Sequence, residues 1–81
     1  MLLFSPYEDA MNEFYRAGGT RVSAIRSPVE VLRAFKRTFP EETAVELRYL
    51  GAPVEPVATQ DYVSVLGSSI AGHTFEWPKP D

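Results

Sequence analysis

The 81-residue chain contains no cysteine and one histidine, His73. Without cysteine it can form neither a disulfide framework nor a thiolate metal site, and thiol catalysis is excluded as well. A lone histidine also excludes a metal site built from several imidazoles. We therefore expect no cofactor, no metal ligands and no catalytic residues, and the small core must be stabilised by packing alone.

Long apolar runs are also missing, and no stretch approaches the length of a membrane span. The N-terminal sequence MLLFSPYEDAMNEF has no positively charged flank and too few apolar residues for a signal peptide. These features predict a soluble, cytoplasmic protein. The glycines match neither the dinucleotide fingerprint nor the nucleotide-binding loop, which argues against a nucleotide site.

What the chain does contain is the composition of an ordinary globular domain, with 44% hydrophobic and 23% charged residues. Its length allows one hydrophobic core. We expect a single α+β domain over residues 1–77 and a frayed, proline-containing tail at 78–81.

Two tetrapeptides, SPYE at Ser5 and SPVE at Ser27, predict helix starts. In each, the serine hydroxyl is expected to cap the helix, the proline presets φ, and the glutamate reaches back to the first turn. Apolar residues then recur at helical spacing. Glycines at 18 and 19 end the first helix and Pro40 ends the second, which predicts helices at about 6–17 and 28–38.

Four segments are predicted as strands from β-branched content or alternation: 20–26, 44–50, 60–66 and 73–77. Residues 51–56, with one glycine and two prolines, are expected to form a turn or irregular edge, and 57–66 could be partly helical. A crossover through the second helix should make 20–26 and 44–50 parallel. The predicted fold is a two-layer sandwich, with both helices on one face of a three- to four-stranded mixed or mostly antiparallel sheet.

Charge is segregated along the chain. Residues 16–37 hold six of the eight basic residues against one acid, a net +5, although the whole chain is at −3. This basic segment makes nucleic-acid binding an alternative function. Against it, the aromatics that could stack on bases lie elsewhere in the sequence, and no nucleic-acid-binding motif is present. The structural interpretation, without any binding function, is a solvated helix face whose cations pair with Glu41, Glu42 and Glu46.

The function that we favour from sequence is a small non-enzymatic protein-interaction module, such as an adaptor, an inhibitor or a subunit of an assembly. Ten aromatics exceed what so small a core is expected to enclose, and tyrosine, tryptophan and arginine commonly anchor interfaces. The candidate partner-binding residues are Tyr15, Arg33, Lys36, Arg37 and Trp77. The partner would be another protein or, through an edge strand at 73–77, a second copy of the chain.

A hydrolase-like site is the remote alternative. His73 with Asp61 and one of the serines 64, 68 or 69 supplies the residue types of a catalytic triad. No strand–elbow–helix signature accompanies them, so chance co-occurrence explains the set better.

Overall fold

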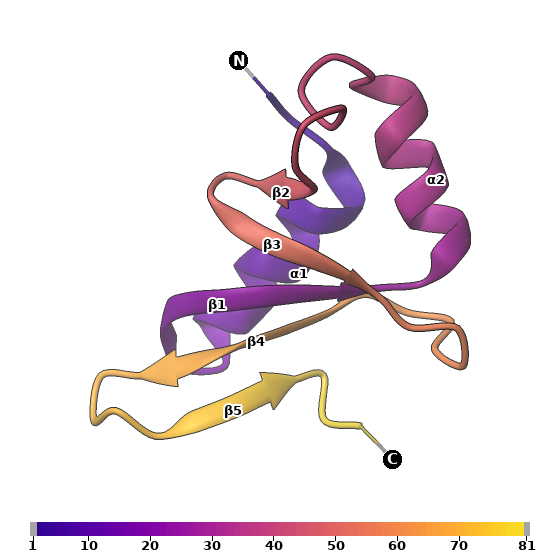
Figure 1. The fold of residues 1–81 in the computed structure, drawn as a ribbon. Coiled ribbons are helices and arrows are strands. Elements are labelled where there is room, and N and C mark those ends of the chain that lie inside the picture. Colours follow the sequence, from indigo (N-terminus) through magenta and orange to yellow (C-terminus); the bar gives the residue numbers. More distant parts are fainter. Residues whose placement is uncertain (1, 81) are drawn as a thin grey trace.

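The computed structural model describes residues 2–80 and has two helices packed against a five-stranded mixed sheet (Figure 1). The helices are α1, Ser5–Arg16, and α2, Val29–Thr38. The strands are β1 Gly19–Ser27, β2 Arg48–Tyr49, β3 Ala52–Pro56, β4 Ser64–Ser69 and β5 Thr74–Trp77. The α+β class and the two-helix layer are confirmed, and the sheet has more strands than expected. Asp81, the last residue of the predicted tail, lies outside the described residues.

The sheet order is β2-β3-β1-β4-β5, which places β1 at the centre. β1 is parallel to β3 and antiparallel to β4, while β2–β3 and β4–β5 are antiparallel pairs. The crossover through α2 therefore leads from β1 to β3, and the prediction that it ends in 44–50 is wrong.

Residues 44–50 do not form the predicted strand because the chain keeps turning after α2. Both the N–H and the hydroxyl of Thr43 donate to the carbonyl of Phe39, at 3.1 and 2.7 Å. Val45, one of the alternating apolar residues, is 95% exposed. Only Arg48 and Tyr49 pair, and they pair with β3.

The segment predicted as a turn, 51–56, instead contains β3, whose two prolines cost no ladder bond. The N–H of Val54 donates to the carbonyl of Leu47, so Val54 and Pro56 both direct their nitrogens toward β2. At Pro56, β3 extends beyond the two residues that pair with β2, so no hydrogen bond is lost there. Val57 donates to Ser27, so Pro53 faces β1, at a point just before the pairing with β1 begins at Val54. Proline is tolerated where a strand has no bond to lose.

β4 begins later than the predicted 60–66 strand and continues beyond its predicted end to Ser69. Gly67 lies within it because the ring of Phe14 packs against the backbone there. A Cβ at Gly67 would collide with the carbonyl oxygen of Arg21 and lie 2.6 Å from Cζ of Phe14. The glycine therefore permits a close approach of helix and sheet rather than a turn.

Both Ser-Pro tetrapeptides lie at helix starts, but neither serine caps its helix. α1 begins at Ser5, after Phe4, and α2 begins after Pro28, and neither has a side-chain cap hydrogen bond. Ser5 is exposed, whereas Ser27 is fully buried. The prediction of serine capping is therefore wrong, although the positions of the helix starts are correct to within one residue.

Helices and sheet meet in a core rich in aromatic rings. Phe4, Tyr7, Phe35 and Tyr49 contact one another edge-on or tilted, with centroid distances of 4.8–5.9 Å. Edge-to-face packing adds stabilisation beyond the buried area. Tyr7 and Tyr49 are both fully buried, so this small core encloses two of the four tyrosines completely.

The hydroxyls of these two tyrosines are satisfied inside the core. Tyr7 donates to the Ser27 hydroxyl at 2.8 Å, and Tyr49 donates to the carboxylate of Glu8 at 2.8 Å while accepting from the N–H of Phe4. Burial raises the pKa of both phenols above 10.0, and for Tyr49 the neighbouring Glu8 raises the pKa further. The two tyrosine hydroxyls thus connect the N-terminal part of the chain to β1 and β2.

Candidate partner-binding surface

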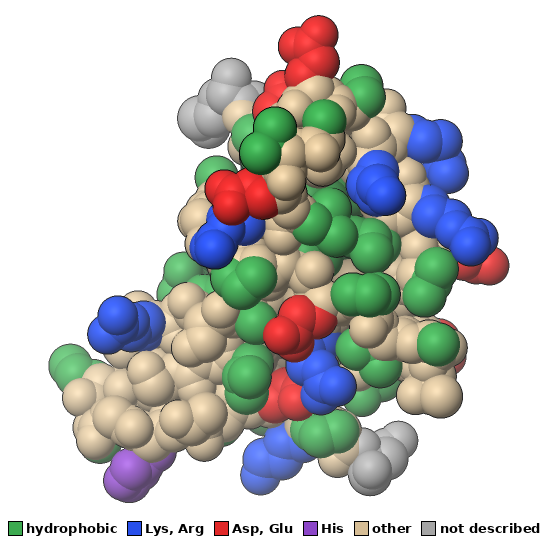
Figure 2. Space-filling model, viewed as in Figure 1, with side chains coloured by type: hydrophobic (Ala, Val, Ile, Leu, Met, Phe, Trp, Pro, Cys, Tyr) green, Lys and Arg blue, Asp and Glu red, His purple; other side chains and the backbone are tan. Residues whose placement is uncertain are grey.

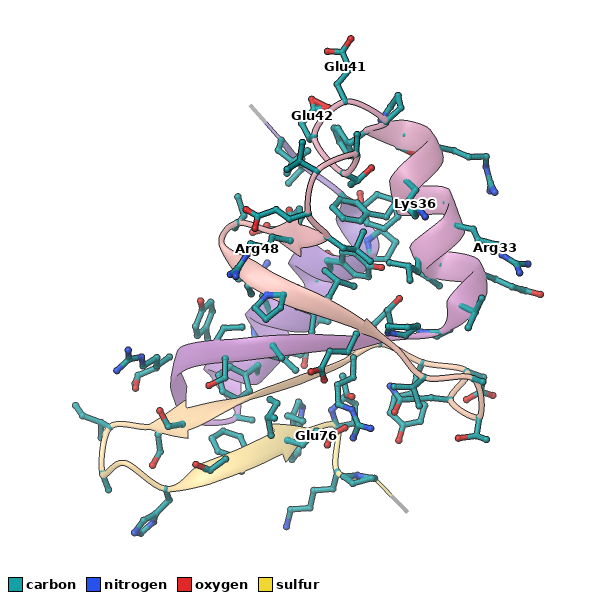
Figure 3. The ribbon with its side chains drawn as sticks, viewed as in Figure 1. Arg33, Lys36, Glu41, Glu42, Arg48 and Glu76 are labelled. Atoms are coloured by element: carbon teal, nitrogen blue, oxygen red, sulfur yellow. The ribbon has the colours of Figure 1, made fainter. Side chains whose placement is uncertain are left out.

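The exposed side of α2 carries three cations in one row. Arg33, Lys36 and Arg37 are three and four residues apart, so helical geometry places them on one face, which we call the basic stripe. All three are exposed, and Figure 3 shows Arg33 extending outward from α2, away from the sheet. In Figure 2, Lys and Arg side chains gather along the edge of the molecule that α2 forms.

Among the described residues, no carboxylate lies within ion-pair distance of the basic stripe. Within residues 2–80, none of its three cations takes part in an ion pair. Glu46 pairs instead with Arg48, at 3.0 Å, and Glu41 and Glu42 project from the loop after α2 (Figure 3). The interpretation that these glutamates pair with the helix cations is wrong.

The remaining cations of the 16–37 segment do not extend the stripe. Arg16 pairs with Glu13 one turn earlier on α1. Arg26 alternates with the core residue Ile25, so it lies on the sheet face away from the helices, where it pairs with Glu76 at 3.0 Å. Arg21 is exposed near the start of β1, away from α2. The cations of the basic segment are therefore divided among α1, β1 and α2 and form no continuous surface.

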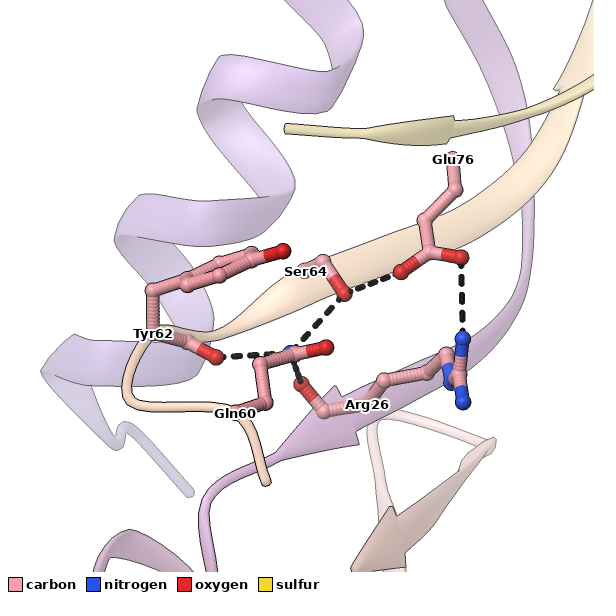
Figure 4. Close-up of polar contacts among 5 residues, drawn as sticks. All are labelled: Arg26, Gln60, Tyr62, Ser64 and Glu76. Carbon is pink, nitrogen blue, oxygen red and sulfur yellow. Dashed lines mark hydrogen bonds and ion pairs between the residues drawn. The ribbon is translucent and has the colours of Figure 1, made fainter. Parts of the chain in front are cut away.

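Arg26 belongs to a closed ring of polar contacts that the sequence did not reveal (Figure 4). Its guanidinium donates to Glu76, Ser64 donates to the other carboxylate oxygen at 2.6 Å, and Gln60 donates to Ser64 at 3.1 Å. Gln60 also donates to the backbone carbonyls of Arg26 and Tyr62, at 3.2 and 2.7 Å. The ring joins β1, β4, β5 and the 57–63 loop, and it uses both oxygens of the carboxylate.

A hollow of about 540 Å³ adjoins the basic stripe at the start of α2. Arg33 forms part of its wall, and the other lining residues are Pro28, Val29, Glu30, Val31, Ala58, Gln60 and Asp61. The stripe is thus bordered by a partly apolar depression. A combination of charged and apolar residues is more typical of a protein interface than of a phosphate-binding surface.

The two aromatic candidates lie away from the stripe and from each other. Tyr15 is 45% exposed and lies two helical turns after Glu8, on the flank of α1 that faces Tyr49. Trp77 packs half-buried against the other flank, where Ala10 and Glu13 line a hollow with it. The five predicted residues therefore do not form one site.

The triad-like residues are also separated. Asp61 precedes β4 and His73 follows it, so the length of the strand lies between them. Ser64 is buried in the polar ring, and the Ser69 hydroxyl accepts from the backbone N–H of His73 rather than from its imidazole. The structure does not assemble these residue types.

Within the described part of the chain, no cluster of histidine and acidic residues could hold a metal ion. Neither helix is long and apolar enough to cross a membrane. Comparison of the chain with protein-family models, with curated proteins and with solved structures gave no match.

Proposed function

We propose that this chain is a small non-enzymatic protein-interaction module that binds an acidic surface of a partner protein through α2. The observation that carries the proposal is the basic stripe, whose cations Arg33, Lys36 and Arg37 have no carboxylate partner among residues 2–80.

The stripe costs the free chain some stability. Like charges three and four residues apart on a helix repel by about 0.2–0.5 kcal/mol per pair. An acidic partner would offset this repulsion by forming contacts of opposite charge with the stripe. Opposite charge also raises the association rate constant. The hollow beside Arg33 offers an apolar anchor point next to the charges.

Nucleic-acid binding is less well supported than it was from sequence. Arg16 and Arg26 are each paired with a glutamate, which leaves Arg21 on β1 and three cations on one short helix. No aromatic side chain lies on the exposed face of α2 to stack on a base. Affinity for phosphate backbones depends on many such charges acting together.

The test is a pull-down from native-host extract, quantified by mass spectrometry, with wild-type chain and the double variant Arg33→Glu/Arg37→Glu. We expect the captured proteins to be acidic on their exposed segments and to be lost from the variant, with wild-type capture weakening as salt rises. A matched control, Arg21→Glu/Lys79→Glu, changes net charge equally away from α2 and should capture the same proteins as wild type.

Equal capture by wild type and the α2 variant would refute the proposal. Nuclease treatment distinguishes protein binding from nucleic-acid binding. If captured material is nucleic acid, or disappears on nuclease digestion, the stripe is a phosphate-binding surface and the partner is not a protein.

A further inference from the structure

The two edges of the sheet differ in what they offer to another strand. The β2 edge has two paired residues and is followed by Leu50 at a φ of 49°, so it gives little backbone to pair with. The β5 edge, at the opposite side of the sheet, has four residues, Thr74–Trp77, with no proline among them (Figure 1). Long unprotected edges are templates for a further strand.

The register with β4 determines which backbone groups of β5 face outward. Ser69 donates to the carbonyl of His73, which marks this as a hydrogen-bonded pair. Bonded and non-bonded pairs alternate along an antiparallel ladder, so Phe75 and Trp77 direct their N–H and C=O toward β4. Thr74 and Glu76 direct theirs away, and no group within residues 2–80 bonds to their N–H.

We propose that β5 pairs with β5 of a second copy of this chain, antiparallel and with the two-fold axis at Phe75. In this register each Thr74 lies opposite Glu76 of the second copy and exchanges both main-chain hydrogen bonds with it. Phe75 lies opposite itself as a non-bonded pair, the closer of the two pair types. The interface is isologous and closes after two copies.

The side chains of this register are compatible. Phe75 stacks on Phe14 at 4.8 Å and is half-buried, so the facing rings extend an aromatic cluster that already exists. Glu76 faces a threonine rather than another acid. The Glu76 carboxylate already accepts hydrogen bonds from Arg26 and Ser64, so dimerisation brings no unpaired charge into the interface.

Neighbouring groups also fit a short, self-limited interface. Glu13 faces the β5 side of α1, where it lines the hollow with Trp77, and its charge is paired with Arg16. Pro78 follows Trp77 and would be the next outward-facing residue, but it has no N–H. Pairing therefore stops there and cannot extend along the tail.

The test compares Thr74→Glu with Thr74→Lys by sedimentation velocity over a range of concentrations. Both substitutions are at an exposed residue, and circular dichroism should show that both variants fold. Thr74→Glu places like charges opposite each other at two symmetric positions, whereas Thr74→Lys faces the same glutamate with opposite charge. We expect wild type and Thr74→Lys to dimerise, and Thr74→Glu to have a dimer dissociation constant about tenfold higher than Thr74→Lys.

Hydrogen exchange gives a second measurement. The amides of Thr74 and Glu76 should become more protected as concentration rises, while those of Phe75 and Trp77 stay protected throughout. A wild-type chain that remains monomeric at millimolar concentration overturns the proposal, as does a Thr74→Glu chain that dimerises as tightly as Thr74→Lys. Because β5 and α2 are separate surfaces, neither result bears on the proposed binding of an acidic partner.

Discussion

The hydroxyl of Tyr7 donates a 2.8 Å hydrogen bond to the hydroxyl of Ser27, and both residues are fully buried. The hydroxyl of Ser27 in turn donates a hydrogen bond to the carbonyl of Pro28 at 3.0 Å. The first helix is thereby tied to the end of the central strand at the point where α2 begins. A serine that resembles a helix cap in sequence instead satisfies a tyrosine in the core.

This contact predicts different outcomes for the two serines of the repeated tetrapeptide. Ser27→Ala leaves the buried Tyr7 hydroxyl without its acceptor and should lower the free energy of unfolding by about 1–3 kcal/mol. Ser5 is exposed and makes no side-chain hydrogen bond among residues 2–80, so Ser5→Ala should change the free energy of unfolding by less than about 0.5 kcal/mol. Urea denaturation of both variants measures the difference, and equal losses would contradict the assignment.

A double variant tests whether the loss comes from the pair. Tyr7→Phe removes the donor, so adding Ser27→Ala to it should cost less than Ser27→Ala costs in the wild-type chain. If the two losses of unfolding free energy simply add, the effect of Ser27→Ala does not come from its contact with Tyr7.

The buried phenols predict a loss of stability at alkaline pH. The pKa of Tyr7 and of Tyr49 is raised above 10.0 in the folded chain, so the unfolded chain gives up these protons first. Their contribution is fully present below pH 10 and is lost as pH rises through the folded-state pKa values. Unfolding free energies measured from pH 8 upward should therefore fall beyond about pH 10.

Tyr7→Phe provides the control for this pH dependence. It removes one late-titrating phenol, so the alkaline decline should be shallower than in wild type. An unchanged decline would assign the effect to other groups.

Gly67→Ala should destabilise the fold, because its Cβ would meet backbone that cannot move aside. The collision involves the Arg21 carbonyl on β1 and the ring of Phe14. Overpacking of this kind typically costs about 1–3 kcal/mol. Thermal or urea unfolding checks the value, with the neighbouring half-buried Ser68→Ala as a control that should stay within about 0.5 kcal/mol.

Glu76→Ala should break the polar ring and leave Ser64 without its acceptor. Since the Glu76 side chain is 11% exposed and Arg26 is 36% exposed, water compensates only the arginine, and we expect a loss of about 1–3 kcal/mol. Glu42→Ala in the loop after α2 is the control, because Glu42 is exposed, lies away from the ring and forms no ion pair within residues 2–80. A similar loss in both variants would mean that the ring adds nothing specific.

Arg33→Glu should separate binding from stability. A glutamate at this position lies three and four residues before Lys36 and Arg37, which is a favourable order on a helix and worth a few tenths of a kcal/mol. The variant should unfold no more easily than wild type while losing the partner. A clear drop in its unfolding midpoint would show that Arg33 supports the fold.

The sequence predicted those features that depend on local pattern. Helix starts, the α2 stripe and the β5 segment follow from proline, periodicity and alternation. The errors came from contacts distant in sequence. Val45 alternates as a strand residue should, but Thr43 has already turned the chain onto Phe39. Pro53 and Pro56 argued against a strand, yet neither nitrogen faces a position where a ladder bond was available.

The candidate site was predictable only in part, for the same reason. The helical spacing of Arg33, Lys36 and Arg37 is visible in the sequence. That Glu46 pairs with Arg48, and Glu76 with Arg26, depends on strands that meet only in the folded chain. Which cations remain unpaired therefore required the structure.

The central position of β1 has a consequence for synthesis of the chain. Its neighbours, β3 and β4, begin at Ala52 and Ser64, long after β1 and α2 have been made. A nascent chain emerging from N- to C-terminus therefore holds β1 with both edges open until β3 has been made, and with one edge open until β4 follows. Local hairpins can form early at β2–β3 and β4–β5, but closing the sheet waits for long-range pairing, which is the slow step in folds of this kind. Until β4 is released, at least one edge of β1 is unpaired, and during that interval the chain is most exposed to mispairing or to a chaperone.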